Sequence, residues 1–379
     1  MMVSRHLSGQ TYCSRCGEER MGALAKFGNA SRISRYLCAK RHNRFLAHEA
    51  RFFGGSSMII CCTLLLGIAS NTTTRGEELG PNDDSSWELS ESASSCAGAV
   101  FSIATSADGD LFAVGGGEGE NSYLAIGDWS NLAQARLLES RPGTIHVHSV
   151  DLDDDGRFVV AGYSDGVVAL FDVAKSNRLW STDAHERFTR AVRFSNDGAS
   201  VYSAGDDGYI CAWSAATGEL QWSIATGQNE VSALEVSPDG MKMASAGNEG
   251  MLAIWDVKNR SRLGAIAKTR SLIDDIAFSP DGQVLACAGP NSSVLVFDTT
   301  PSPRTFEPRA TIETSAGIVW SVDFGPDGQE LAIAHGTFVS VAKVETGEIT
   351  ASWKAHRLTA TWLGFGKDGR SLLSGSWDR

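Results

Sequence analysis

Short apolar runs alternate with tight turns along most of the chain. In the stretch 185–222 these runs fall at 189–194, 201–204, 209–213 and 220–222. Ser-Asn-Asp-Gly at 195–198 and Asp-Asp-Gly at 206–208 separate the first three runs and are typical of tight turns. β-Branched and aromatic residues within the runs favour strands. The stretch therefore predicts four short strands joined as an antiparallel meander.

The same unit recurs seven times. An Asp-Gly pair marks the first turn of each unit, with glycines at positions 109, 156, 198, 240, 282, 328 and 369. The spacing of 41–47 residues is that of a repeat architecture, in which a small unit buries its apolar face only against its neighbours. The pattern predicts an all-β fold built from stacked four-stranded units.

The repeats resemble those of the WD-repeat β-propeller family over about 99–379. Ser-Pro-Asp-Gly turns at 237–240 and 279–282 and the Trp-Asp pair at 255–256 fit the family signature, with Phe-Asp at 171–172 and 297–298 as aromatic replacements. The resemblance implies seven blades around a central channel.

The resemblance also implies a structural hydrogen-bonded set in each blade. In the third unit this set would be His185, Ser203, Asp207 and Trp213. A Ser-His-Asp set is also found in hydrolases, but its place in a blade turn favours the structural interpretation. The seventh unit has its own histidine, His356, whereas the other five lack one at this position. Those five blades are expected to depend mainly on apolar packing.

The seventh unit is incomplete at the C-terminus. Its second turn falls at Asp378, and the chain ends at Arg379, before a third strand. The segment 87–89 could supply the outer strand from the N-terminal side, which would still leave the third strand missing. We expect a truncated sequence or gene model. The alternatives are closure by a partner and an irregular substitute strand from 83–95.

The residues before the propeller differ in composition. We predict a basic low-structure leader at 1–57, a short apolar segment at 58–70, an acidic or polar linker at 71–95 and the propeller at 96–379. The leader has ten Lys or Arg residues against three acids, and the leader as a whole is expected to be largely disordered. Cys13, Cys16, Cys38 and His42 have the ligand types of a zinc site, although their spacing is loose. The alternative is a basic tail with incidental cysteines.

The uncharged stretch 52–74 raises the question of compartment. Its apolar centre is too short for a spanning helix and suits the core of a signal peptide, with Gly67 and Ala69 as a small-x-small cleavage pattern. The basic region before it is too long for an ordinary signal. A secretory signal or membrane anchor, a transit peptide and a disordered or wrongly predicted leader all remain open.

Charge and cysteine usage narrow the class of partner. From Gly76 onward the chain has 22 basic and 42 acidic residues, which opposes nucleic-acid binding by the propeller. No disulfide framework is visible there, because Cys96, Cys211 and Cys287 are its only cysteines. We expect a cytoplasmic protein, with a membrane-anchored or secretory-pathway form through 52–74 as the alternative.

The repeat register predicts a candidate binding face. The residue eight positions before each turn glycine should occupy an equivalent place on the innermost strand of its blade. Among these residues we predict that His148, Arg190, Asp274 and Trp320 bind partner proteins near the channel mouth. They form no catalytic set and no metal site, and no cofactor is expected.

The sequence thus predicts a non-enzymatic protein–protein interaction scaffold in a multiprotein complex. One alternative is a membrane-tethered or lumenal propeller in trafficking. Another is a substrate receptor of a cullin-type ubiquitin ligase, because Trp-Asp-Val-Lys at 255–258 resembles the box of such receptors. A propeller enzyme is the least favoured alternative.

Overall fold

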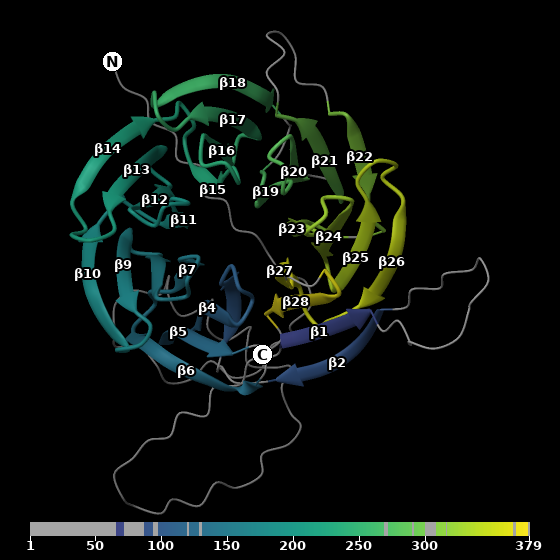
Figure 1. Cartoon of the computed structure of the whole chain (residues 1–379), viewed down its shortest axis with the longest axis horizontal. Helices are drawn as coiled ribbons and strands as arrows, with labels where there is room; N and C mark the ends of the chain where they lie inside the picture. Colours follow the sequence, from purple (N-terminus) through teal and green to yellow (C-terminus); the bar gives the residue numbers. More distant parts are fainter. Residues whose placement is uncertain are drawn as a thin grey trace, which may run out of the picture. The chain divides into compact units, whose positions relative to one another are not determined.

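The structure, a computed structural model, divides the chain into two units, 1–58 and 59–379. It describes residues 66–71, 87–93, 98–119, 121–128, 131–268, 272–289, 292–299, 308–315, 317–366 and 369–377, all in the second unit. Within the described part of that unit, every regular element is a β-strand, and the strands form seven four-stranded sheets. Figure 1 shows these sheets as blades arranged around a central channel.

The first four blades each use four consecutive strands. Blade one contains β3 (Ala99–Thr105), β4 (Leu111–Glu118), β5 (Asn121–Asp128) and β6 (Asn131–Pro142). Blade two contains β7 (Val147–Leu152), β8 (Phe158–Tyr163), β9 (Val167–Asp172) and β10 (Asn177–Asp183). Blade three contains β11 (Thr189–Phe194), β12 (Ser200–Gly205), β13 (Tyr209–Ser214) and β14 (Leu220–Ala225). Blade four contains β15 (Val231–Val236), β16 (Lys242–Gly247), β17 (Met251–Asp256) and β18 (Ser261–Lys268).

Blades five and six follow the same order. Blade five contains β19 (Ile276–Phe278), β20 (Val284–Gly289), β21 (Ser293–Asp298) and β22 (Ala310–Glu313). Blade six contains β23 (Val319–Phe324), β24 (Glu330–His335), β25 (Phe338–Lys343) and β26 (Ile349–Lys354). In each blade the first strand lies nearest the channel and the last lies on the rim (Figure 1). The predicted all-β propeller is therefore confirmed.

The seventh blade combines two strands from before blade one with two strands from after blade six. The C-terminal side supplies only β27 (Ala360–Phe365) and β28 (Ser371–Ser376), as predicted. β1 (Leu66–Asn71) pairs with β28, and β2 (Trp87–Ala93) pairs with β1, which gives the sheet order β2-β1-β28-β27. The outer strand near Trp87 is confirmed. The expectation that the third strand is missing is wrong, because β1 takes that place. The leader 1–57 and the residues 58–65, 72–86 and 94–97 lie outside the described residues.

The seven turn glycines explain why the repeat keeps its shape. Gly109, Gly156, Gly198, Gly240, Gly282, Gly328 and Gly369 all have φ between 63° and 75°. Only glycine adopts this left-handed region without a steric penalty, so the Asp-Gly pair fixes the reversal between the first and second strands.

The apolar core lies between the blades. The described residues form seven hydrophobic clusters, and each combines residues of two neighbouring blades. The cluster between blades two and three, for example, joins Val160 and Leu170 to Val192 and Trp213. The cluster between blades seven and one joins Leu373 to Val100 and Phe112. Since each blade buries its faces only against its neighbours, the ring forms one cooperative core.

Candidate functional site at the channel mouth

The innermost strands enclose a central cavity of about 430 Å³. All seven residues that stand eight positions before a turn glycine line it: Phe101, His148, Arg190, Ser232, Asp274, Trp320 and Thr361. The repeat register thus placed these seven side chains on one ring. It brings together the four candidates His148, Arg190, Asp274 and Trp320, whose role in binding a partner stays a prediction.

On blades one to three the ring is filled by a continuous stack. The Phe101 and His148 rings lie 5.3 Å apart with an interplanar angle of 28°. His148 meets Phe188 edge to face at 5.1 Å, and the Arg190 guanidinium lies 4.5 Å from the centre of the Phe188 ring. Burial is the main reason that the pKa of His148 falls to about 4, with Arg190 and His146 adding to the effect. His148 is therefore neutral at pH 7 and serves as an aromatic member of the stack.

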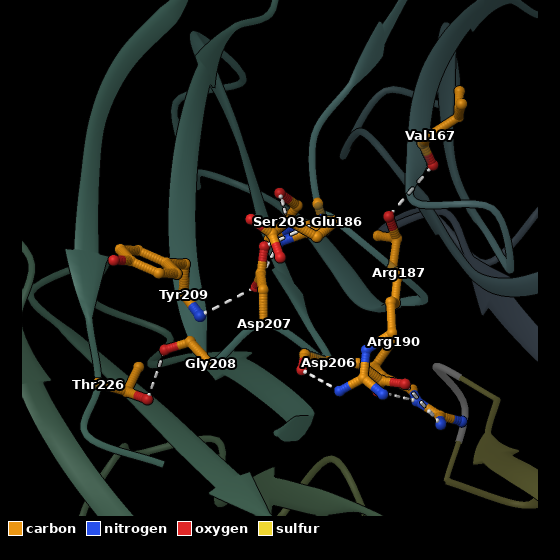
Figure 2. A network of polar contacts seen from close by, with 12 residues as sticks. Val167, Glu186, Arg187, Arg190, Ser203, Asp206, Asp207, Gly208, Tyr209 and Thr226 are labelled. Atoms are coloured by element: carbon orange, nitrogen blue, oxygen red, sulfur yellow. Dashed lines mark hydrogen bonds and ion pairs between the residues drawn. The ribbon is translucent and has the colours of Figure 1, made fainter. Parts of the chain in front are cut away.

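Arg190 is already neutralised within blade three. Its Nε and Nη2 donate to the two carboxylate oxygens of Asp206 at 2.6 and 3.2 Å, as Figure 2 shows. Asp206 is buried, so this bidentate pair replaces the water that its carboxylate has lost. Arg190 consequently has little charge left for an anionic ligand.

The ring has a different character on blades five to seven. Asp274 is half-buried, and no described residue donates a hydrogen bond to its carboxylate. Burial raises its pKa to about 6, although Arg190 acts in the opposite direction. Trp320 meets Trp377 edge to face at 5.3 Å, and Trp377 is 36% exposed. This half combines an acid that has no hydrogen-bond donor among the described residues with a partly accessible aromatic pair.

The two remaining ring residues hold blades together. Ser232 donates a hydrogen bond to the carbonyl oxygen of Ile273, in the next blade, at 2.6 Å. Thr361 of blade seven donates to the carbonyl oxygen of Val100 in blade one at 2.7 Å. Both hydroxyls are therefore occupied by structural contacts.

Below the mouth lies a layer of charged residues that sequence reasoning missed. Asp151, Arg193, Glu235 and Asp323 each stand five positions before a turn glycine, and Asp275 stands seven before. Arg193 Nε donates to Glu235 Oε2 at 2.6 Å, joining blades three and four. The repeat register that gave the mouth residues could have revealed this layer as well, because charged residues recur at one equivalent position of an inner strand.

The acids of this layer tie blades to one another through backbone amides. Asp151 accepts a hydrogen bond from the N–H of Phe194 at 2.7 Å. Asp275 accepts from the hydroxyl of Ser321 at 2.8 Å and from the N–H of Val322 at 3.1 Å. In each case the acceptor belongs to one blade and the donor to another, so these carboxylates stabilise the channel wall.

Burial dominates the electrostatics of the layer. It raises the pKa of Asp151 and of Asp323 to about 7 and that of Asp275 to about 6. Burial alone would lower the pKa of Arg193, but Glu235 and Asp151 outweigh it and hold that pKa above its ordinary value. The layer has four carboxyl groups and a single guanidinium among these five residues, so its net charge is negative once the acids ionise.

The hydrogen-bonded set expected in blade three is present. The His185 Nδ1–Asp207 Oδ1 distance is 2.9 Å and the His185 Nε2–Ser203 Oγ distance is 2.8 Å. Trp213 Nε1 donates to Ser203 Oγ at 2.9 Å. Ser203 is fully buried, and its hydroxyl is shared between His185 and Trp213, so it is not accessible for attack on a substrate. Figure 2 shows Ser203 and Asp207 inside blade three. In blade seven, His356 Nε2 lies 2.9 Å from Ser374 Oγ.

Blades four and six contain polar substitutes for the missing histidine. In blade four, Gln228 Oε1 accepts from Ser245 at 2.9 Å, and Ser245 accepts from Trp255 Nε1 at 2.9 Å. In blade six, His335 Nε2 lies 2.8 Å from Ser340 Oγ. These two blades therefore have a buried polar set in addition to their apolar packing, and their dependence mainly on apolar packing stays a prediction. Gln228 stands one position after the place where the histidine was sought, which is why the register missed it.

Blade two fills the same space from its second strand. Tyr163 is fully buried, its hydroxyl donates to Glu139, and the Arg141 guanidinium lies 4.0 Å from the centre of its ring. The equivalent residue of blade three is Gly205, where a Cβ would lie 2.7 Å from the His185 ring. In blade three the glycine at this position thus leaves room for His185, whereas in blade two Tyr163 fills that room.

Other sequence candidates have structural roles or lie outside the described residues. Trp255 of the Trp-Asp-Val-Lys stretch is buried and bonded to Ser245, so its indole cannot contact a partner. The four zinc candidates in the leader lie outside the described residues. Among the residues that are described, no His, Cys, Asp or Glu cluster could hold a metal ion. No helix in this part of the chain is long and apolar enough to cross a membrane.

Comparison with known families agrees with the architecture. A family model described as WD domain, G-beta repeat, matches residues 139–172 and 265–298. Each match ends on a Phe-Asp pair in the third strand of a blade. A second model, described as outer membrane protein assembly factor BamB, matches residues 164–263. No curated protein matches the chain. The seven blades, the hydrogen-bonded set of blade three and the repeat matches together support a β-propeller of the WD-repeat family.

Proposed function

We propose that the protein is a non-enzymatic scaffold that binds partner proteins at the mouth of its channel. The observation that carries the proposal is the ring at the mouth, where half-buried Trp320, exposed Trp377 and an acid that has no donor among the described residues stand opposite a packed stack. Aromatic anchors beside a few polar groups are typical of binding hot spots. A rigid propeller holds these groups in place without ordering them on binding.

The chemistry of the channel supports binding in preference to catalysis. The ionisable groups of the deeper layer are engaged in contacts between blades, and Ser203 with His185 is buried in blade three. A catalytic site requires a nucleophile or a general acid–base pair that a substrate can reach. The mouth residues His148 and Arg190 are held in a stack and an ion pair.

Affinity capture from cells followed by mass spectrometry tests the proposal. The full chain, a Trp320→Ala variant and an Arg190→Ala/Trp320→Ala variant would be compared. Proteins recovered with the natural chain should be lost or strongly reduced with both variants. Thermal melting would monitor the fold, because Arg190→Ala leaves buried Asp206 without its partner, whereas Trp320→Ala keeps that pair.

A matched control uses residues outside the cavity. Arg157 is exposed and follows the turn at the other end of the innermost strand, and Leu220 is 54% exposed on the rim strand β14. Arg157→Ala/Leu220→Ala should recover the same proteins as the natural chain. Equal recovery by the mouth variants, with the fold intact, would assign binding to another face.

The compartment is a separate proposal, and we favour the cytoplasm. Residues 66–71 of the apolar stretch form the third strand of blade seven, and a strand held in that sheet is not at the same time inserted in a membrane or removed by cleavage. The match to a family described as outer membrane protein assembly factor BamB keeps a membrane-tethered or lumenal propeller as the second candidate. Protease protection of the full chain distinguishes them, because a lumenal protein resists protease until the membrane is dissolved.

A further inference from the structure

We infer that the channel mouth binds a lysine or arginine side chain of a partner segment, with Asp274 receiving the cationic head and Trp320 and Trp377 contacting its hydrocarbon part. This inference rests on the function proposed above and specifies the chemistry of the partner. Four independent features of the mouth support it.

The first feature is the state of Asp274. Its carboxylate has lost much of its water, which raises its pKa to about 6, and no described residue donates a hydrogen bond to it. A carboxylate that is partly desolvated and accepts no hydrogen bond from a described residue is unfavourable in its charged form. A bound ammonium or guanidinium supplies both the missing donors and the opposite charge.

The second feature is the aromatic pair next to Asp274. Trp320 occupies the neighbouring ring position on blade six, and Trp377 packs edge to face against it from the turn after β28. Indole faces attract cations and accept the methylene groups of lysine and arginine. Phe188, by contrast, is already covered by Arg190.

The third feature is the charge beneath the mouth. Asp151, Glu235, Asp275 and Asp323 line the same cavity, and Arg193 is the cation that faces them. Low-dielectric walls concentrate such a field at the opening, which favours a cationic group and opposes a phosphate. The cation of the ring itself, Arg190, is held by Asp206.

The fourth feature is the apolar border on the same half. Leu272, Ile318 and Leu358 precede the innermost strands of blades five, six and seven and are 36%, 56% and 53% exposed. The loops that precede the innermost strands of blades three and four expose Glu186, Arg187 and Asn229, and Arg357 is exposed beside Leu358 in blade seven. The favoured partner segment therefore has apolar residues on either side of its basic residue.

Titration calorimetry on the full chain tests the inference with defined peptides. The first probe has the sequence Leu-Leu-Arg-Leu-Leu between flanking serines, which keep it soluble, and is acetylated and amidated at its ends. The other probes replace the central arginine by lysine, glutamine or phosphoserine. The arginine and lysine peptides should bind, the glutamine peptide should bind at least about tenfold more weakly, and the phosphoserine peptide should be weakest. Equal binding of the glutamine peptide, or tighter binding of the phosphoserine peptide, overturns the inference.

Two variants locate the binding. Asp274→Asn, which keeps the shape of the side chain, should weaken binding of the arginine peptide about tenfold or more, and Trp377→Ala should weaken it as well. Asp281 is the exposed acid of the Asp-Gly turn at 281–282 and does not line the cavity. Asp281→Asn should therefore leave the affinity unchanged. If Asp274→Asn binds the peptide as tightly as the natural chain does, the inference is wrong.

Different results would contradict the scaffold proposal and the inference that the mouth binds a basic side chain. If Asp274→Asn recovers every cellular partner that Trp320→Ala loses, the mouth binds proteins but does not select a basic residue. If neither variant changes recovery, the scaffold proposal for this face fails together with the inference.

Discussion

The carboxylate of Asp323 in blade six accepts a hydrogen bond from the backbone N–H of Phe365 in blade seven at 2.7 Å. Asp151 of blade two makes the same contact with Phe194 of blade three, also at 2.7 Å. Both acids stand five positions before a turn glycine, and both donors stand four positions before the next one. A repeated position of the inner strand thus joins neighbouring blades by one part-buried hydrogen bond.

This contact makes the stability of the ring depend on pH. Burial, with Glu235 and Asp275 nearby, raises the pKa of Asp323 to about 7, although the N–H of Phe365 opposes the rise. Because the folded pKa lies above the unfolded value, the contribution of this group to stability is present below about pH 4 and is lost as pH rises through about 7. The free energy of unfolding should therefore fall between pH 5 and pH 8.

Asp323→Asn should remove this dependence while its amide oxygen keeps the acceptor for Phe365. Relative to the natural chain, the variant should gain stability as the pH rises from 5 to 8, by about 2–3 kcal/mol at most. Urea unfolding at a series of pH values measures the effect. The opposite sign, with the variant losing ground at pH 8, would show that Asp323 is ionised and stabilised in the folded state.

Asp281→Asn is the matched control. Its carboxylate lies in an exposed turn, where the Ser279 hydroxyl is the main cause of its lowered pKa. A lowered folded pKa gives stability that is present above about pH 4 and is lost only as the pH falls through the folded value. This substitution should therefore change the stability equally at pH 5 and pH 8.

The closure of blade seven leads to a prediction about strand β1. Ala69 pairs with Leu372 of β28 on one side and with Leu89 of β2 on the other. Ala69→Pro places a residue without an N–H in the middle of a strand that is paired on both sides, so it should reduce the free energy of unfolding by well over ~1 kcal/mol and lower the Tm.

Ala93→Pro makes the same change at the end of the outermost strand, where proline is tolerated. It should alter the Tm much less than Ala69→Pro. Scanning calorimetry of both variants measures the difference. An Ala69→Pro protein that melts as the natural chain does would show that residues 66–71 do not close the ring.

Ser203 provides a test of the hydrogen-bonded set. Its hydroxyl lies between His185 Nε2 and Trp213 Nε1, both buried, so Ser203→Ala leaves two polar atoms without a partner. We expect a loss of about 1–3 kcal/mol in the free energy of unfolding. Ser200→Ala, on the same strand, removes only an exposed bond to Gln221 and should cost less than ~0.5 kcal/mol. Similar losses for the two variants would mean that the set contributes little to stability.

The sequence predicted the features that recur and missed those that differ between blades. The Asp-Gly period located the strands, and the register then placed the seven mouth residues on one ring, because each blade repeats the same backbone geometry. Tyr163 and His335 could not be found from a histidine position, since they enter the same space from the second strand. β1 was missed because its Gly67 and Ala69 were interpreted for cleavage and not for pairing, and strand pairing across the chain depends on tertiary contacts.

Gln228 offers the clearest test of whether another polar side chain replaces the histidine of the hydrogen-bonded set. Its amide accepts from Ser245 at 2.9 Å and donates to the carbonyl oxygen of Met251 at 2.7 Å, and the side chain is buried. Gln228→Ala should cost about 1–3 kcal/mol in the free energy of unfolding, because Ser245 and Met251 both lose a buried partner. Gln221→Ala is the same chemical change on the rim strand β14, where the side chain is exposed, and it should cost less than ~0.5 kcal/mol. If the two alanine variants unfold at the same urea concentration, Gln228 does not replace the histidine set in blade four, and apolar packing alone stabilises that blade.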